Sequence, residues 1–180
     1  MTIQPGDTIP NVNLYVIGES GGPEAKPAHE LLGGKKVVLF AVPGAFTRTC
    51  SARHLPGFVC HADDIKAKGV DEVACISVND AAVMKAWGEA HGAAGKVTML
   101  SDGVADFAKA IGIFTDMSAR GYGVRSKRYA MLIDNNVVQE VSSPLASTAS
   151  PAPRRCWSGW ARAAASWRSS SSARSTRTWR

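Results

Sequence analysis

The chain has 180 residues, enough for one domain of ordinary size, and 45% of them are hydrophobic, a fraction typical of soluble globular proteins. No stretch approaches the roughly 18 consecutive apolar residues of a membrane helix, and the opening MTIQPGDTIP has neither the basic start nor the apolar core of a secretory signal. We therefore expect a cytoplasmic protein with no membrane partner.

The formal net charge of +6 suggests nucleic-acid binding, but its distribution argues against that function. Residues 142–180 contain seven Arg, no Lys and no acidic residue. Removing these seven from the 21 Lys and Arg of the chain leaves 14 against 15 acidic residues in 1–141, a net charge of −1. The body of the protein is nearly neutral, and we expect no nucleic-acid partner.

The first half of the chain alternates strand and helix patterns. Residues 35–42 are a short apolar run between Gly-Gly and Pro-Gly, typical of a strand buried on both faces. Apolar side chains then recur at helical spacing up to Lys68, and Gly69 tolerates the left-handed conformation that ends a helix. The predicted elements are a strand over 11–17, a Gly/Pro loop over 18–27, a buried strand over 35–42, a helix over 49–68 and a buried strand over 72–78.

The second half continues the alternation and ends in a hairpin. A helix capped by Asn79 or Asp80 stops at Gly92. Asn135-Asn136 predicts a tight turn, because Asn tolerates positive φ. The remaining predicted elements are a strand over 96–102, a short helix over 103–112, a loop over 115–128 and two strands over 128–134 and 137–141. This order predicts an α/β fold with a mixed sheet.

The pattern changes after Val141. Residues 142–180 are rich in Ser, Ala and Arg, contain four of the five Trp, and have no sustained period. Such a composition predicts a poorly ordered low-complexity tail after a domain spanning residues 1–141. Two origins stay open: translation of a GC-rich gene in a shifted frame, or a genuine basic tail.

Cys50 is the candidate reactive residue. The four cysteines form no CxxC pair and no zinc-binding spacing, so they are buried thiols or include a reactive one. Cys50 follows Pro43-Gly44 at the predicted start of a helix, where free N–H groups and the helix dipole stabilise the thiolate that reactions require. Thr47 and Thr49 add hydroxyl donors nearby. These residues alone do not distinguish this reading from a buried structural cysteine.

A longer motif resembles a known family. The run PGAFTRTC, residues 43–50, resembles the active-site signature of the peroxiredoxins. The further match through HLPGF, SVNDAAVMKAW and RSKRYAMLIDNNVV is similar to the type II (peroxiredoxin-5-like, atypical) members and covers residues 3 to 140. This resemblance implies a thioredoxin-like fold, with a central mixed sheet flanked by helices.

The resemblance also implies an activity and site residues. The expected reaction is reduction of hydrogen peroxide and alkyl hydroperoxides, with Cys50 as the peroxidatic residue that becomes a sulfenic acid. Thr47 would hydrogen-bond the thiolate and the peroxide, Arg128 would stabilise the thiolate and the departing oxygen, and Pro43 and Gly44 would shape the pocket. No metal or organic cofactor is required, and a homodimer is expected.

Several questions stay open at this stage. Cys75 matches the position of a resolving cysteine, or it is a small side chain in a buried strand. The reductant is glutathione/glutaredoxin or thioredoxin. Arg48 stands where the family usually has proline, so it either favours the thiolate or loosens the loop. The alternative function is a thioredoxin-fold redox sensor or binding module with little turnover.

Overall fold

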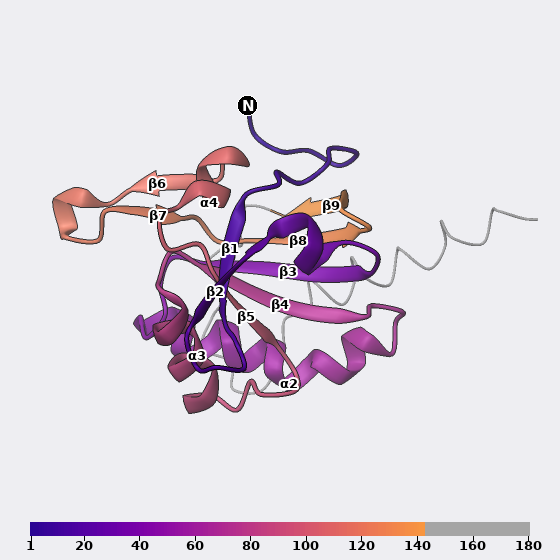
Figure 1. Ribbon diagram of the computed structural model, residues 1–180, viewed down its shortest axis with the longest axis horizontal. Helices are drawn as coiled ribbons and strands as arrows, with labels where there is room; N and C mark the ends of the chain where they lie inside the picture. The colour runs from indigo at the N-terminus through magenta and orange to yellow at the C-terminus, as the bar shows by residue number, and fades with distance from the viewer. Residues whose placement is uncertain (143–180) are drawn as a thin grey trace, which may run out of the picture. The chain divides into compact units, whose positions relative to one another are not determined.

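The computed structural model describes residues 1–142, in which a seven-stranded mixed sheet carries helices on both faces (Figure 1). These residues belong to one compact unit, Met1–Thr148. The predicted tail over 142–180 lies outside them, apart from Ser142. The thioredoxin-like fold with its central mixed sheet is confirmed. In spatial order the strands are β2 (Pro23–Pro27), β1 (Asn13–Ile17), β5 (Thr98–Ser101), β4 (Glu72–Ser77), β3 (Lys36–Val42), β8 (Tyr129–Asp134) and β9 (Val137–Ser142).

Strand β3 lies between a parallel and an antiparallel neighbour. It runs parallel to β4 with Phe40 opposite Cys75, and antiparallel to β8 with Ala41 opposite Tyr129. All of β3 except its first residue is buried, as expected for a strand covered on both faces. The register places the start of β8 beside the end of β3, and this edge of the sheet carries the residues discussed below.

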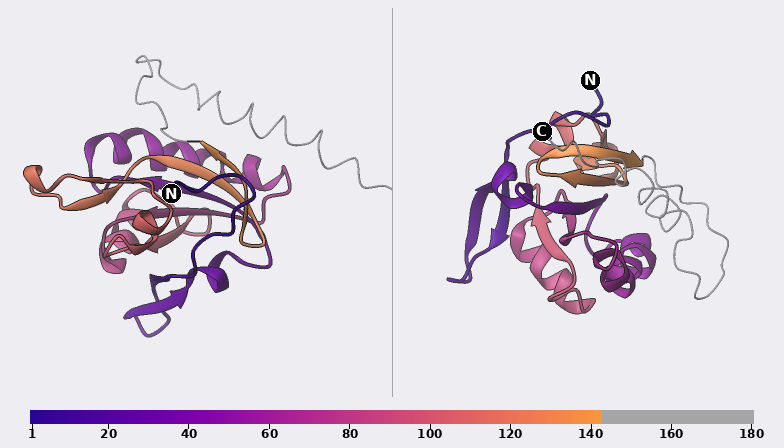
Figure 2. Two further views of the ribbon diagram at one scale, coloured as in Figure 1. Left: turned by 90° about the horizontal axis from the view of Figure 1, so that it is seen from above. Right: turned by 90° about the vertical axis from the view of Figure 1, so that its right-hand side faces the viewer.

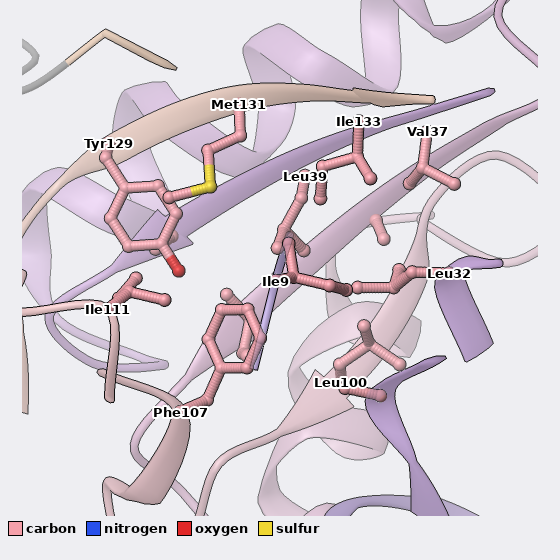
Figure 3. Packing of buried hydrophobic residues seen from close by; sticks show 14 of the residues in the cluster. Ile9, Leu32, Val37, Leu39, Leu100, Phe107, Ile111, Tyr129, Met131 and Ile133 are labelled. Atoms are coloured by element: carbon pink, nitrogen blue, oxygen red, sulfur yellow. The ribbon is translucent and has the colours of Figure 1, made fainter. Parts of the chain in front are cut away.

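One face of the sheet holds the main core (Figure 3). Leu39 of β3 and Tyr129 of β8 pack there with Phe107, which belongs to helix α4 (Asp106–Ala110). The short helix α1 (Ala28–Leu32), which the sequence patterns did not predict, contributes Leu32 to the same cluster. Burial of these apolar side chains is the main stabilising contribution on this face.

The other face is covered by helices α2 (Leu55–Lys66) and α3 (Ala81–Ala90), which lie on the same side of the sheet in Figures 1 and 2. Phe58 of α2 stacks on Phe40 of β3, with ring centroids 3.7 Å apart. Gly88 brings α3 close to β5, because a Cβ at this position would lie 2.8 Å from Cγ of Met99. Both helices are thereby packed tightly on the strands.

Three predicted segments differ from the structure. The second half of the loop expected over 18–27 is strand β2, which pairs with β1. The loop expected over 115–128 is largely a hairpin of β6 (Phe114–Asp116) and β7 (Val124–Ser126) around a 3₁₀ turn, Ser118–Arg120, and it projects from the sheet in Figure 1. These strands are short and little buried, so they lack the apolar pattern that predicts a strand.

The third difference concerns the helix predicted over 49–68. It begins with a π-helical turn, Cys50–His54, which continues directly into α2.

Two local predictions agree with the structure. Asp80, one of the two predicted caps, accepts a hydrogen bond from the Val83 amide at the start of α3. The turn at Asn135 and Asn136 has φ values of 46° and 66°, as predicted. Within residues 1–142, no helix is long and apolar enough to cross a bilayer.

Candidate active site

The loop after β3 shapes one wall of the candidate site. A Cβ on Gly44 would lie 3.1 Å from Thr47 Cγ2 and 3.3 Å from Arg125 Nη1, so this position has no room for a side chain without movement. Phe46 has φ +58°, a conformation that is unusual for a bulky residue, and its side chain is 58% exposed. The loop therefore has a narrowly defined path from β3 to the turn that carries Cys50.

Cys50 begins the π-helical turn and is completely buried. Its Sγ accepts a hydrogen bond from Nη2 of Arg128 at 3.3 Å. The neighbouring amide of Ser51 donates to the Thr47 carbonyl at 2.9 Å, so that amide does not point freely at the sulfur as the sequence-based dipole argument assumed. In the described part of the chain, the guanidinium of Arg128 is the donor that reaches Sγ.

Sheet register brings Arg128 to the sulfur. Because Tyr129 lies opposite Ala41, Arg128 lies beside Val42, the last residue of β3, where the loop begins. Its Nε is buried and has no hydrogen-bond partner among residues 1–142. Arg128 therefore keeps a donor beyond the one that contacts Cys50.

The Thr47 hydroxyl makes a hydrogen bond within the loop itself. Its hydroxyl donates to the Gly44 carbonyl at 2.8 Å, so its proton is directed away from Cys50. A hydroxyl that donates once still has lone pairs to accept a hydrogen bond. The geometry thus allows Thr47 to accept from a bound molecule, while the predicted donation to the thiolate is not present in this arrangement.

The pKa of His54 is lowered by the surroundings of its imidazole. Its pKa is lowered from 6.5 to about 4, first by burial and then by the positive charges of Arg128 and Arg53. The imidazole is therefore uncharged at neutral pH. A base with so low a pKa contributes little to removing a proton from a thiol, so His54 is a poor candidate for that step.

Cys75 lies on β4 on the same face of the sheet as Phe40, the face that α2 covers. Burial raises the pKa of its thiol well above the ordinary value, with a smaller contribution from Cys50. Cys50, Cys60 and Cys75 are all free thiols, and Cys60 is exposed on α2 instead of packing in the core. The structure therefore brings Cys50 and Cys75 into electrostatic range without joining them.

A polar network that sequence reasoning missed supports the loop. Oδ1 of Asn79 accepts from the Ala45 amide and from the Ser77 hydroxyl, each at 2.9 Å. Nη1 of Arg125 donates to the carbonyl of the preceding residue, Val78, at 2.8 Å. The signal in the sequence was a polar pair following a buried strand, which was interpreted only as a helix cap.

The site offers thiol chemistry supported by positive charge. Within residues 1–142, no group of three or more His, Cys, Asp or Glu side chains could hold a metal ion. A buried sulfur beside a guanidinium can react as a thiolate nucleophile, because the cation stabilises the ionised form.

Comparison with known proteins agrees with this chemistry. A family model described as Redoxin matches residues 4–151. Peroxiredoxin-2B of Arabidopsis thaliana is 44% identical over 133 residues, which are 74% of this chain and 82% of the plant protein. The chloroplastic peroxiredoxin-2E-2 of Oryza sativa is 49% identical over 142 residues, 77% of this chain and 63% of that protein.

Solved structures give the same result. The reduced Prx3 of Vibrio vulnificus in complex with H₂O₂ is 52% identical, has a TM-score of 0.76, and the match covers 84% of this chain and 95% of that one. Peroxiredoxin 5 of Alvinella pompejana is 38% identical with a TM-score of 0.72, over 79% and 90% of the two chains. Together with the buried thiol and its arginine, these matches show that the chain belongs to the peroxiredoxins, the thiol-dependent peroxidases of the thioredoxin fold, and to their type II branch.

Proposed function

We propose that Cys50 is the peroxidatic cysteine of this peroxidase. The Cys50 thiolate attacks one oxygen of the hydroperoxide, a sulfur–oxygen bond forms, and the oxygen–oxygen bond breaks. The other oxygen leaves with the substrate's organic group or hydrogen, takes up a proton, and departs as an alcohol or water. Cys50 is left as a sulfenic acid, oxidised by two electrons.

The observation that carries this proposal is the 3.3 Å contact between Arg128 Nη2 and Cys50 Sγ. A guanidinium is always charged and presents several donors in a fixed arrangement. One donor can stabilise the thiolate while the unpartnered Nε remains for the departing oxygen, where negative charge develops in the transition state. Arg128 thus has the position and the donors that the reaction needs.

The loop residues complete the proposed pocket. Thr47, whose hydroxyl already donates to Gly44, would accept a hydrogen bond from the peroxide O–H. Pro43 and Gly44 would limit the space beside the sulfur, since a Cβ on Gly44 would already crowd Thr47 and Arg125. A small pocket of this kind favours hydrogen peroxide and slim alkyl hydroperoxides.

Cysteine variants test the assignment. Cys50→Ser should abolish peroxide consumption in an assay with dithiothreitol as reductant, because serine is not ionised at neutral pH. Cys60→Ser, a matched change at an exposed thiol on α2, should retain wild-type turnover. Equal peroxide consumption by the wild type and Cys50→Ser would exclude Cys50 as the reacting residue.

The reductant is proposed to be glutathione, alone or with glutaredoxin, and thioredoxin is the alternative. A surface hollow of about 390 Å³ beside the Cys50 turn is lined by Arg48, Thr49, Ala52 and Arg53. No acidic residue occurs between residues 31 and 62, so this surface favours a thiol that carries carboxylates. Arg48→Ala should raise the KM for glutathione several-fold and leave turnover with uncharged dithiothreitol unchanged. An equal effect on both reductants would contradict this role.

Cys75 is the proposed internal resolving thiol only if its surroundings open. Its raised pKa keeps the thiol protonated while it is buried, and a protonated thiol is a poor nucleophile. Cys75→Ser should therefore retain turnover when glutathione is in excess. If Cys75→Ser loses turnover with every reductant, resolution passes through Cys75.

A homodimer through the surface near the site completes the proposal. Phe46, one residue before Thr47, is 58% exposed, and Tyr122 of the neighbouring hairpin is exposed as well. Arg125 contacts both Tyr122 and the loop, so the two aromatic side chains belong to one region of the surface. Phe46→Asp should shift the sedimentation coefficient from that of a dimer to that of a monomer.

A further inference from the structure

The reduced site is closed around its sulfur. Cys50 has no exposed surface, and Cys75 on the facing strand has none either. A thiol that resolves the Cys50 sulfenic acid must approach the sulfur in line with the leaving oxygen. Neither an external thiol nor Cys75 can do so while the turn Cys50–His54 stays packed, so this turn must open during each catalytic cycle.

One hydrogen bond joins this turn to the fixed part of the molecule at the residue after Cys50. Nε1 of Trp87 donates to Oγ of Ser51 at 3.0 Å. Trp87 is fully buried on α3, and the close packing of Gly88 on β5 holds this part of α3 against the sheet. The donor is therefore immobile, whereas its acceptor belongs to the turn that has to move.

We propose that the Trp87–Ser51 hydrogen bond is a latch that holds the Cys50 turn closed and so sets how the sulfenic acid divides between resolution and overoxidation. This inference rests on Cys50 being the peroxidatic residue. Trp87 and Ser51 act here as positioning residues, since they act through the position of the turn.

The two fates of the sulfenic acid have opposite requirements. A hydroperoxide is smaller than a thiol reductant, so in the closed turn a second one can reach the sulfur as the first did and transfer one oxygen, giving Cys50 sulfinic acid and an alcohol or water. In the open turn, a thiol attacks the sulfur, a disulfide forms, and the oxygen leaves as water after taking up a proton. A weaker latch therefore favours the disulfide and disfavours the sulfinic acid.

Three variants test the latch. Ser51→Ala removes the acceptor and Trp87→Phe removes the donor, while Ser51→Thr keeps a hydroxyl and should behave as the wild type. Loss of one ordinary hydrogen bond corresponds to a change of about 2- to 10-fold in the opening equilibrium. We expect the sulfinic acid formed per turnover to fall by that factor in the first two variants. Mass spectrometry of Cys50 after turnover at several peroxide concentrations gives this ratio.

A control separates the latch from general destabilisation. Asp80→Ala removes the cap of the same helix, so it weakens α3 without changing any group that contacts the turn. It should lower the unfolding midpoint but leave the ratio of sulfinic acid to disulfide at the wild-type value. Amide hydrogen exchange of the reduced protein should show faster exchange over residues 50–55 in Ser51→Ala and wild-type exchange there in Asp80→Ala.

The outcome that would overturn the latch is specific. If Ser51→Ala and Trp87→Phe both fold but keep the wild-type ratio and the wild-type exchange over residues 50–55, the hydrogen bond does not control opening. This failure would leave the assignment of Cys50 intact, because that assignment depends on the separate loss of activity in Cys50→Ser. Should Trp87→Phe fail to fold, Ser51→Ala alone decides.

Discussion

At the scale of single residues, the reactivity proposed for Cys50 depends on a partner 78 positions away in the sequence. Arg128 reaches the sulfur because the register of β3 with β8 places it beside the end of β3. The Thr47 hydroxyl, which the motif also offers, is occupied by the Gly44 carbonyl. Among the described residues, the hydrogen bond to the sulfur thus comes from the Arg128 side chain, and replacing that residue should have a large effect.

Replacing Arg128 is expected to slow the oxidation step. Arg128→Gln removes the charge and should lower the second-order rate of Cys50 oxidation by hydrogen peroxide about 10²- to 10³-fold, the usual effect of losing one such donor. Arg128→Lys keeps the positive charge but lacks the several donors of a guanidinium. Its oxidation rate should therefore lie between those of the wild type and Arg128→Gln. Stopped-flow kinetics measures these rates. Arg120→Gln, at an exposed arginine in the β6–β7 hairpin, is the control and should match the wild type.

Asn79 should affect catalysis by holding the loop in place, not by supplying charge. Its side-chain oxygen holds the Ala45 amide and so fixes the loop that carries Thr47. Asn79→Ala leaves that amide without its acceptor, and we expect kcat/KM for peroxide to fall about 10-fold, corresponding to roughly 1.4 kcal/mol. Asn79→Asp retains an acceptor oxygen and should keep most of the activity. Equal losses in both variants would mean that the hydrogen bond to Ala45 is not the reason.

At the scale of elements, the sequence predicted the strands, helices and turns that are determined by a local residue pattern. The buried run of β3, the helix that ends near Gly69 and the Asn135-Asn136 turn each have a local cause, and the structure contains all three. Strand β2 and the β6–β7 hairpin were missed because they exist through pairing with a neighbour and bury little apolar surface. A pattern of burial cannot predict a strand that is mostly exposed.

In the candidate site, too, features that a local motif carries were predicted, and contacts that only the folded chain makes were not. The motif PGAFTRTC and the arginine before β8 were found through their resemblance to the motifs of the family. The Asn79 network and the Trp87–Ser51 hydrogen bond were not found, since each joins residues that only the folded chain brings together. The direction of the Thr47 proton likewise depends on the path of the loop, which the sequence does not specify.

The packing of α3 on β5 gives a test at this scale. Gly88→Ala should destabilise the protein by about 1–3 kcal/mol, the usual cost of overpacking, because its Cβ would lie 2.8 Å from Met99 Cγ. Gly57→Ala, in α2, is the matched change: its Cβ would meet nothing within 4 Å, so the better helix propensity of alanine should stabilise by up to about 1 kcal/mol. Urea unfolding measures both. A stabilising Gly88→Ala would show that Met99 moves aside freely.

At the scale of the whole molecule, charge is distributed unevenly. The stretch between residues 31 and 62 has no acidic side chain, although residues 1–141 together are nearly neutral. Arg53 and Arg128 both lower the pKa of His54, so their fields overlap within the fold next to Cys50. The protein therefore folds with positive charge gathered at the site, and its stability should respond to pH there.

His54 makes this response measurable. Its pKa is about 4 in the folded protein and near 6.5 when unfolded, so between these values the unfolded chain binds a proton that the folded chain does not. The free energy of unfolding should therefore fall as the pH is lowered from about 6.5 to 4. Because His54 is only partly buried, solvent screening reduces this loss to about 1 kcal/mol.

His54→Gln should remove this part of the pH dependence, so its unfolding free energy should decline less than that of the wild type between pH 6.5 and 4. Arg53→Gln removes one of the two positive charges and should raise the pKa of His54, which NMR titration of the imidazole measures directly. Burial is the larger cause, so the pKa should stay below 6.5 even in this variant. A His54 that titrates near 6.5 in the wild type would mean that neither its burial nor the two arginines act on it as the structure indicates.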